Sequence, residues 1–133
     1  MHRLDHVALR VADLDRAITF YRDKIGLSLM FSEVDPEHHE AFAFLELEGG
    51  NLELLQLLDD GNQPLPFTQP APAPPWCPHV ALGVADLDAL MGTLAENGLA
   101  LLKGPLEIPG KVRWLYLADP DNNVLEFVQW LRD

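Results

Sequence analysis

The feature that most constrains this chain is a stretch of sequence that occurs twice. HVALRVADLD at residues 6–15 returns as HVALGVADLD at residues 79–88, with nine of ten letters unchanged. A second match, LELLQLL at 52–58 with LEFVQWL at 125–131, has the same offset of 73 residues. Two separated matches at one offset indicate an internal duplication. Because 133 residues is the usual length of one domain, both copies are expected to share one fold.

Each copy predicts the same order of elements, a strand, a helix and three more strands. In the first copy, Asp13 is a plausible N-cap and Gly26 a plausible C-cap of the helix. Alternating apolar residues predict its strands at 3–11, 27–34, 41–48 and 51–58. In the second copy the expected strands are 78–84, 99–103, 111–118 and 123–131, and the helix runs from about 86 to 96. The predicted fold class is therefore α+β, with two tandem βαβββ modules.

A proline-rich stretch separates the copies. Residues 59–78 hold seven of the eleven prolines, which favours an extended connector. One module of four strands and one helix would leave open sheet edges, and a second copy can complete it. We therefore predict a single domain of residues 1–133, with modules at 3–58 and 79–131 joined by this linker around a cavity.

Charge and composition exclude several classes of function. The formal net charge is −12, so the surface repels phosphate backbones and nucleic-acid binding is not expected. No apolar run is long enough to span a membrane, and the N-terminal residues do not have the pattern of a signal peptide, so a cytoplasmic protein is expected. The lone Cys77 is interpreted as a small apolar residue rather than a nucleophile.

Four repeated polar residues are the candidates for chemistry: His6, Glu53, His79 and Glu126. Taken singly, each is of a type that is more often structural, but together they recur as two pairs at one spacing. Period-two alternation places each glutamate on a largely apolar strand, where an unpartnered carboxylate is costly. Lys and Arg are scarce, with 9 against 21 Asp and Glu, so a metal ion is the expected partner. Two imidazoles and two carboxylates suit Zn, Ni, Co, Mn or Fe(II).

These motifs resemble the vicinal oxygen chelate superfamily of glyoxalase, bleomycin resistance and dioxygenase proteins. The segments LDHVALRVADLDRAITFYRDKIGL, HVALGVADLD and DPDNNVLEF carry the resemblance, which covers nearly all of residues 3–130. It implies a curved mixed sheet around one divalent metal ion (Zn, Ni, Co or Mn). In glyoxalase I and methylmalonyl-CoA epimerase the ligand positions match His6, Glu53, His79 and Glu126. Drug-sequestering members usually lack a complete ligand set, so the resemblance implies an enzyme.

Both of these enzymes share features with the chain. Arg10 matches a glyoxalase I position that meets a glutathione carboxylate, yet Leu57 and Pro75 stand where that enzyme has polar or basic anchors. The segment DPEHHEAF resembles the epimerase, whereas the DPD turn that precedes Asn122 is glyoxalase-like. Arg10 and the loop residue His38 are the candidate substrate-binding residues, and neighbouring His39 is more often solvated in such loops.

The resemblance implies proton transfer at the carbon next to a carbonyl, through a metal-stabilised enediolate. The substrate would be a small molecule with two adjacent oxygens that chelate the ion. Glu126 is the first candidate for the base, and Glu53 is the pseudosymmetric candidate for the opposite face. The resemblance also implies a homodimer.

Two alternatives remain open. An extradiol-type dioxygenase of this superfamily uses two His and one Glu around Fe(II), and a fourth ligand at Glu53 argues against it. A non-catalytic binding protein for a drug or metabolite would keep the cavity, with Trp76, Trp114 and Trp130 as stacking surfaces. Such a binder would show no proton exchange between substrate and solvent.

Overall fold

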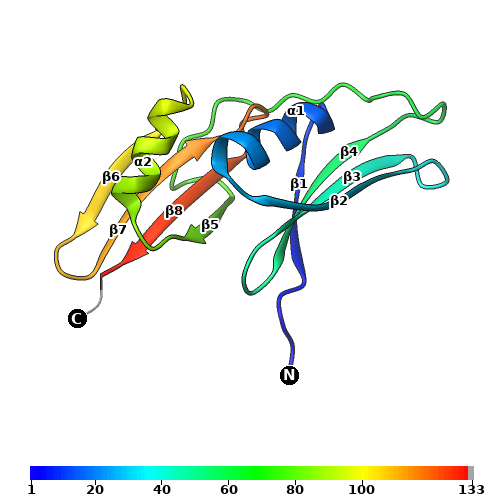
Figure 1. The fold of residues 1–133 in the computed structure, drawn as a ribbon. Helices are drawn as coiled ribbons and strands as arrows, with labels where there is room; N and C mark the ends of the chain where they lie inside the picture. Colours follow the sequence, from blue (N-terminus) through cyan, green and yellow to red (C-terminus); the bar gives the residue numbers. More distant parts are fainter. Residues whose placement is uncertain (132–133) are drawn as a thin grey trace. The chain divides into compact units, whose positions relative to one another are not determined.

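The computed structural model describes residues 1–131 and divides into two compact units at the bond between Gln69 and Pro70. Figure 1 shows that both units have the same order of elements. The first contains β1 (His6–Arg10), α1 (Leu14–Ile18), the π-helical segment η1 (Thr19–Ile25), β2 (Ser28–Asp35), β3 (Glu40–Glu46) and β4 (Asn51–Leu57). The second contains β5 (His79–Gly83), α2 (Leu87–Glu96), β6 (Lys103–Ile108), β7 (Val112–Ala118) and β8 (Val124–Trp130).

Each unit folds its four strands into its own mixed sheet. The strand orders are β1-β4-β3-β2 and β5-β8-β7-β6. The pairs β1–β4 and β5–β8 are parallel, and the other neighbours are antiparallel. The predicted α+β class and the two βαβββ modules are confirmed. That the two modules form one cooperative domain stays a prediction.

The first helix begins where the sequence predicts. The Asp13 side chain accepts a hydrogen bond from the backbone N–H of Arg16 at 3.1 Å, which satisfies an otherwise unpaired donor of the first turn. The helix ends at Gly26, whose φ of 96° is left-handed and favours glycine. A second cap was not anticipated: the Gln56 amide oxygen on β4 accepts from the Leu14 N–H at 2.9 Å.

The same arrangement recurs 73 residues later. Asp86 accepts from the Ala89 N–H at 3.0 Å, and the Gln129 amide oxygen on β8 accepts from the Leu87 N–H at 2.8 Å. Because the same pairs of side chains hold the start of both helices, the duplication extends to the contacts between helix and sheet.

Alternation on β3 and β4 separates a core face from an open face. Helix α1 packs against β3 and β4, and the side chains on that face are buried. They are Ala41, Ala43, Leu45, Leu52, Leu54 and Gln56. The opposite face carries half-buried side chains, among them Phe44 and Glu53. Glu53 therefore lies on the side of the sheet away from the helix.

One predicted strand is wrong. The expected strand follows the apolar run at 99–103, whereas the observed strand β6, Lys103–Ile108, begins at the last residue of that range and continues through Pro105. Pro105 is tolerated because β6 is at the edge of its sheet and pairs with β7 only. Its pairing with β7 is irregular between Lys103 and Leu106.

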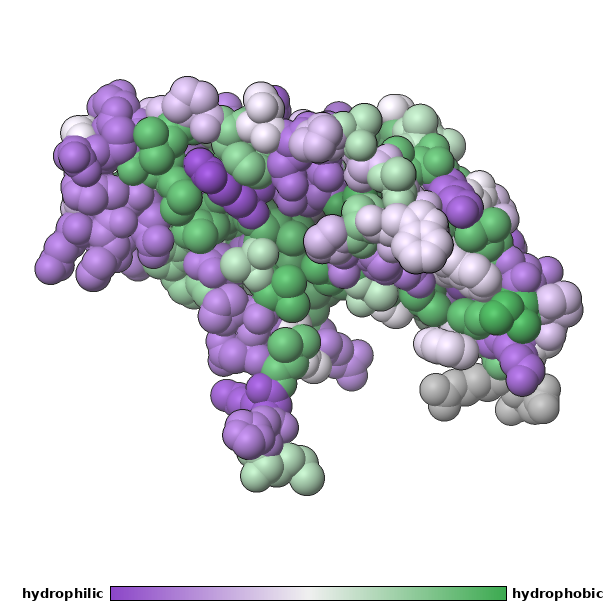
Figure 2. All heavy atoms as spheres, turned by 180° about the vertical axis from the view of Figure 1, so that it is seen from behind, coloured by the Kyte–Doolittle hydropathy of each residue, from purple (hydrophilic) through white to green (hydrophobic). Residues whose placement is uncertain are grey.

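Apolar side chains are also exposed, and on the face shown in Figure 2 apolar and hydrophilic residues are interspersed. Those on β2 include Met30, Phe31 and Val34. Within residues 1–131, no helix has the length and apolarity to cross a membrane.

Candidate functional site

The first module brings His6 and Glu53 together. His6 begins β1, Glu53 lies on β4, and the parallel pairing of these strands sets Glu53 opposite Ala8. The His6 Nε2 atom is 3.5 Å from Oε1 of Glu53. The other ring nitrogen, Nδ1, is 2.7 Å from the Asp5 carboxylate. One imidazole and one carboxylate therefore face each other, with a second carboxylate behind the ring.

The second module brings His79 and Glu126 together in the same way. His79 begins β5, Glu126 lies on the parallel strand β8, and their Nε2 and Oε1 atoms are 3.1 Å apart. The His79 Nδ1 atom is 2.8 Å from the carbonyl oxygen of Cys77. Each predicted His–Glu pair is thus formed within its own module.

The chemistry of both pairs fits a metal ion. Histidines that bind metals commonly donate Nδ1–H to a carboxylate or a backbone carbonyl, which leaves the Nε2 lone pair for the ion. Asp5 and the Cys77 carbonyl are acceptors of this kind. Within residues 1–131, no group of three or more His, Cys, Asp or Glu side chains is placed to hold a metal. Each module by itself therefore brings together one imidazole and one carboxylate.

Local environment changes the protonation of the first pair. Burial raises the pKa of Glu53, whose side chain is 14% exposed, and the nearby His6 only partly opposes this. The hydrogen bond that the Asp5 carboxylate accepts from the His6 ring raises the pKa of His6 and lowers that of Asp5 itself. A cation near Glu53 would offset the cost of burying its charge.

An aromatic ring lies beside each pair, and neither ring was singled out from the sequence. Phe44 is the cross-strand partner of Glu53, and its ring meets that of His6 edge-on at 5.3 Å. Tyr116 is the partner of Glu126 in the second module, and its ring meets that of His79 at 5.5 Å. Burial, followed by the Glu126 charge, raises the pKa of Tyr116. Phe44 alternates with the buried Ala43 and Leu45, but its place beside Glu53 follows from strand register, as does that of Tyr116 beside Glu126.

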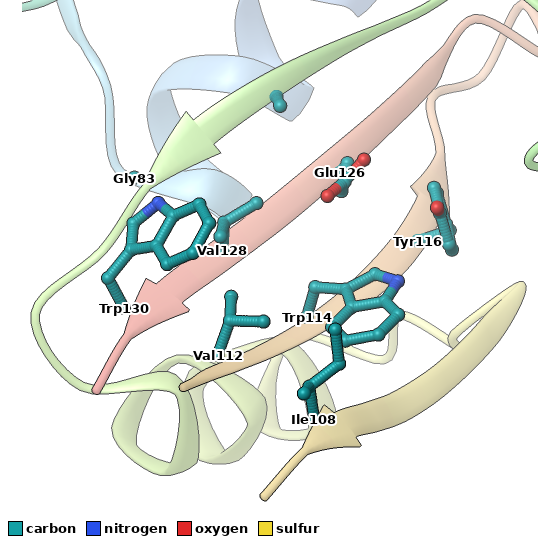
Figure 3. Close-up of a pocket in the computed structure, with 9 residues that line it drawn as sticks. Gly83, Ile108, Val112, Trp114, Tyr116, Glu126, Val128 and Trp130 are labelled. Carbon is teal, nitrogen blue, oxygen red and sulfur yellow. The ribbon is translucent and has the colours of Figure 1, made fainter. Parts of the chain in front are cut away.

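The open face of the second sheet carries a pocket of about 500 Å³. Figure 3 shows Glu126 near one end of it, with two indoles and aliphatic side chains around the rest. Its lining residues are Ala81, Gly83, Ile108, Val112, Trp114, Tyr116, Glu126, Val128 and Trp130. Three strands that are separate in the sequence contribute most of the lining, so no local motif indicated the pocket.

The structure places the two candidate substrate-binding residues differently. Arg10 is half-buried on β1, and its guanidinium lies 4.5 Å from the centre of the Phe67 ring in the linker. His38 lies on the exposed turn between β2 and β3, where its ring is 2.8 Å from Asp35. Its neighbour His39 is 2.7 Å from the Asn62 side chain, which ties that turn to the linker.

The three tryptophans differ in their surroundings. Trp76 is 91% exposed in the linker, and Trp130 is 64% exposed at the end of β8. Trp114 is half-buried on β7 and lines the pocket together with Trp130. Two of the three are therefore placed to contact a bound molecule on the second sheet.

Comparisons with known proteins find relatives with two different enzyme names. The chain is 30% identical over 138 residues to the probable lactoylglutathione lyase of Vibrio cholerae, covering 96% of this chain and 91% of that protein. It is 32% identical over 100 residues to the ethylmalonyl-CoA/methylmalonyl-CoA epimerase of Cereibacter sphaeroides, covering 75% of this chain and 74% of that protein.

A solved structure shares the fold at lower identity. TnmS3, an antibiotic binding protein from Streptomyces sp. CB03234, superposes with a TM-score of 0.72 at 22% identity, covering 98% of this chain and 97% of that one. The family model described as the Glyoxalase/Bleomycin resistance protein/Dioxygenase superfamily matches residues 3–127. The chain belongs to this superfamily.

Proposed function

We propose that the protein is a metal-dependent enzyme that transfers a proton at the carbon next to a carbonyl. The observation that carries this proposal is the repeated His–Glu pair. In both pairs an acceptor holds Nδ1 while Nε2 faces a carboxylate oxygen. Relatives named lactoylglutathione lyase and epimerase support a reaction of this class.

The proposed ligands of one divalent ion are His6, Glu53, His79 and Glu126. Zn, Ni, Co or Mn suits this mixture of imidazole and carboxylate donors. When bound, such an ion would withdraw negative charge from the two adjacent oxygens of a small substrate.

The proton would be moved by a glutamate of the chain. Glu126 is our first choice for this base, and Glu53 serves the opposite face of the substrate. An epimerase needs a base on each face, whereas a lyase of the glyoxalase type needs one on the face it uses. Arg10 would pair with a substrate carboxylate, and His38 is proposed to contact substrate from its turn.

Metal titration tests the ligand set. Calorimetric titration of stripped protein with Zn, Ni, Co and Mn should give one ion per chain. Glu126→Ala and His79→Ala should each weaken it by at least tenfold, because each removes a ligand. His2→Ala is the matched control, because His2 is exposed and outside both pairs. If Glu126→Ala and His79→Ala both bind the metal ion as tightly as wild type does, the proposed site is refuted.

Complementation tests the proposed homodimer. A His6→Ala/Glu53→Ala variant and a His79→Ala/Glu126→Ala variant should each lack proton exchange. If two copies share each site, mixing them restores part of the exchange, because some hybrid sites hold all four ligands. If one copy supplies the whole site, mixing restores nothing, while size measurements still report the dimer.

A non-catalytic small-molecule binding protein is the second candidate. The aromatic pocket on the second sheet favours it, and the fold is shared with the antibiotic binding protein TnmS3. Deuterium incorporation from solvent at the carbon next to a carbonyl would exclude this alternative, because a pure binder moves no proton.

A further inference from the structure

The pocket on the open face of the second sheet is largely apolar, unlike the neighbouring pair of His79 and Glu126. Glu126 is the only ionisable carboxylate among its nine lining residues, and none of the nine is Lys or Arg. The remaining lining is aliphatic or aromatic. A carboxylate or phosphate group of a ligand would find no cation there and would be repelled by Glu126. The occupant that fits is therefore uncharged and apolar.

A comparison with the first module explains why the second sheet has space for this pocket. The repeat aligns Arg10 of β1 with Gly83 of β5. Arg10 lies against the Phe67 ring, so its side chain occupies that part of the first sheet. At Gly83 an added Cβ would meet no atom within 4 Å, so this part of the second sheet is empty. The absence of a side chain at Gly83 lengthens the pocket away from Glu126.

Two indoles give the pocket flat apolar walls. Trp114 takes the place that Phe42 has in the first module, as the cross-strand partner of Val128. Trp130 takes the place of Leu57 and leaves most of its ring exposed. Figure 3 shows both indoles bordering the pocket, with the Ile108 side chain close to that of Trp114. Aromatic rings stack favourably on such surfaces.

We propose that this pocket binds an aryl-sized, uncharged substituent on the substrate carbonyl, with the reacting carbon next to Glu126. The inference rests on the proposed function, because it assigns the non-reacting part of that enzyme's substrate. A volume of about 500 Å³ lies within the range of small-molecule sites, which run from about 300 to 1,000 Å³. The second module would thus determine which substituent on the substrate carbonyl is accepted.

Two small ketones test the proposal directly. Hydroxyacetone and 2-hydroxyacetophenone present the same two adjacent oxygens and differ only in a methyl or phenyl group on the carbonyl. Loss of the CH₂ proton signal in D₂O reports proton transfer on each ketone. Calorimetric binding to metal-free protein reports the pocket without any turnover. We expect the phenyl ketone to be preferred by at least about tenfold in both measurements.

Three variants locate the preference. Gly83→Arg copies the first module and fills open space, so it should fold and remove the preference. Trp114→Ala removes an indole wall and should lower the preference about tenfold. Phe42→Ala, at the equivalent position of the first module, is the matched control and should retain the phenyl preference. Circular dichroism verifies that each variant is folded.

The outcomes separate this inference from the proposed function. If the phenyl ketone is preferred and Gly83→Arg abolishes this preference, the proposed role of the pocket is supported, whether or not protons are exchanged. If binding shows the preference but neither ketone exchanges protons, the pocket stands and the proposed function fails. Exchange of both ketones at equal efficiency overturns the pocket and leaves the proposed function intact. Absence of both binding and exchange overturns the two proposals together.

Discussion

Replacement of Gln56 by Met should destabilise the first module. The two side chains have similar length, but Met lacks the amide oxygen that accepts the Leu14 N–H at 2.9 Å. Both residues are buried, so water cannot readily replace this acceptor. An unsatisfied buried donor costs about 1–3 kcal/mol, and we expect about 2 kcal/mol for Gln56→Met. Gln129→Met is the matched change in the second module, and its half-buried side chain should reduce the cost to about 1 kcal/mol.

The same two variants test whether the modules unfold together. Scanning calorimetry of a single cooperative domain would show one transition that both substitutions lower. Independent modules would show two transitions, and each substitution would lower only one. For a unit of about 65 residues, each kcal/mol lowers the melting temperature by about 4–8 °C. The reasoning is refuted if Gln56→Met changes the free energy of unfolding by less than about 0.5 kcal/mol, because the buried donor would then have found another acceptor.

Three further variants test the first His–Glu pair and the backbone. Asp5→Asn should weaken metal binding about tenfold in a calorimetric titration. Loss of a residue that hydrogen-bonds a metal-binding histidine typically weakens metal binding about 10–100-fold, and we expect the smaller effect because the Asp5 side chain is 74% exposed. In urea unfolding at varied pH, the pair of Asp5 and His6 should stabilise wild type over Asp5→Asn below the unfolded histidine pKa of about 6.5. That difference should vanish as pH rises through the raised pKa of His6, and again as pH falls through the lowered pKa of Asp5. Gly104→Ala should destabilise the fold by more than about 1 kcal/mol, because its φ is 104° and a Cβ would lie 3.0 Å from the Trp114 carbonyl. Gly92→Ala within α2, where a Cβ meets nothing, should instead stabilise by about 0.5–1 kcal/mol by thermal melting.

Local patterns were sufficient to predict most of the elements. Alternation predicted the strands at 41–48 and 51–58, and capping residues located the helix between Asp13 and Gly26. Alternation and capping each involve only a few neighbouring residues, so both can be recognised in the sequence without knowledge of the fold. The offset of 73 residues then related the first strand, the start of the helix and the last strand of one module to those of the other.

Features that depend on strand register could not be predicted in this way. The contact of Gln56 with the start of α1 joins residues 42 apart. The position of Tyr116 beside Glu126 follows from the pairing of β7 with β8. The apolar run at 99–103 also misplaced β6, since an edge strand needs ladder hydrogen bonds on one side only and can therefore continue through Pro105. The arrangement of the two His–Glu pairs around one ion stays a prediction.

The duplication is retained where both modules perform the same task and lost where they do not. The helix caps and the His–Glu pairs recur at one offset, because both sheets need a covered face and both pairs present the same donors. The neighbouring positions differ: Arg10 corresponds to Gly83, and Phe44 corresponds to Tyr116. A ligand set that is nearly symmetric would accept a substrate in either of two orientations. Under the proposed function, Arg10 on the first sheet and the apolar pocket on the second would remove that equivalence, because a substrate carboxylate would pair with Arg10 and an aryl group would enter the pocket. The substrate's own asymmetry would then decide which glutamate meets the reacting carbon.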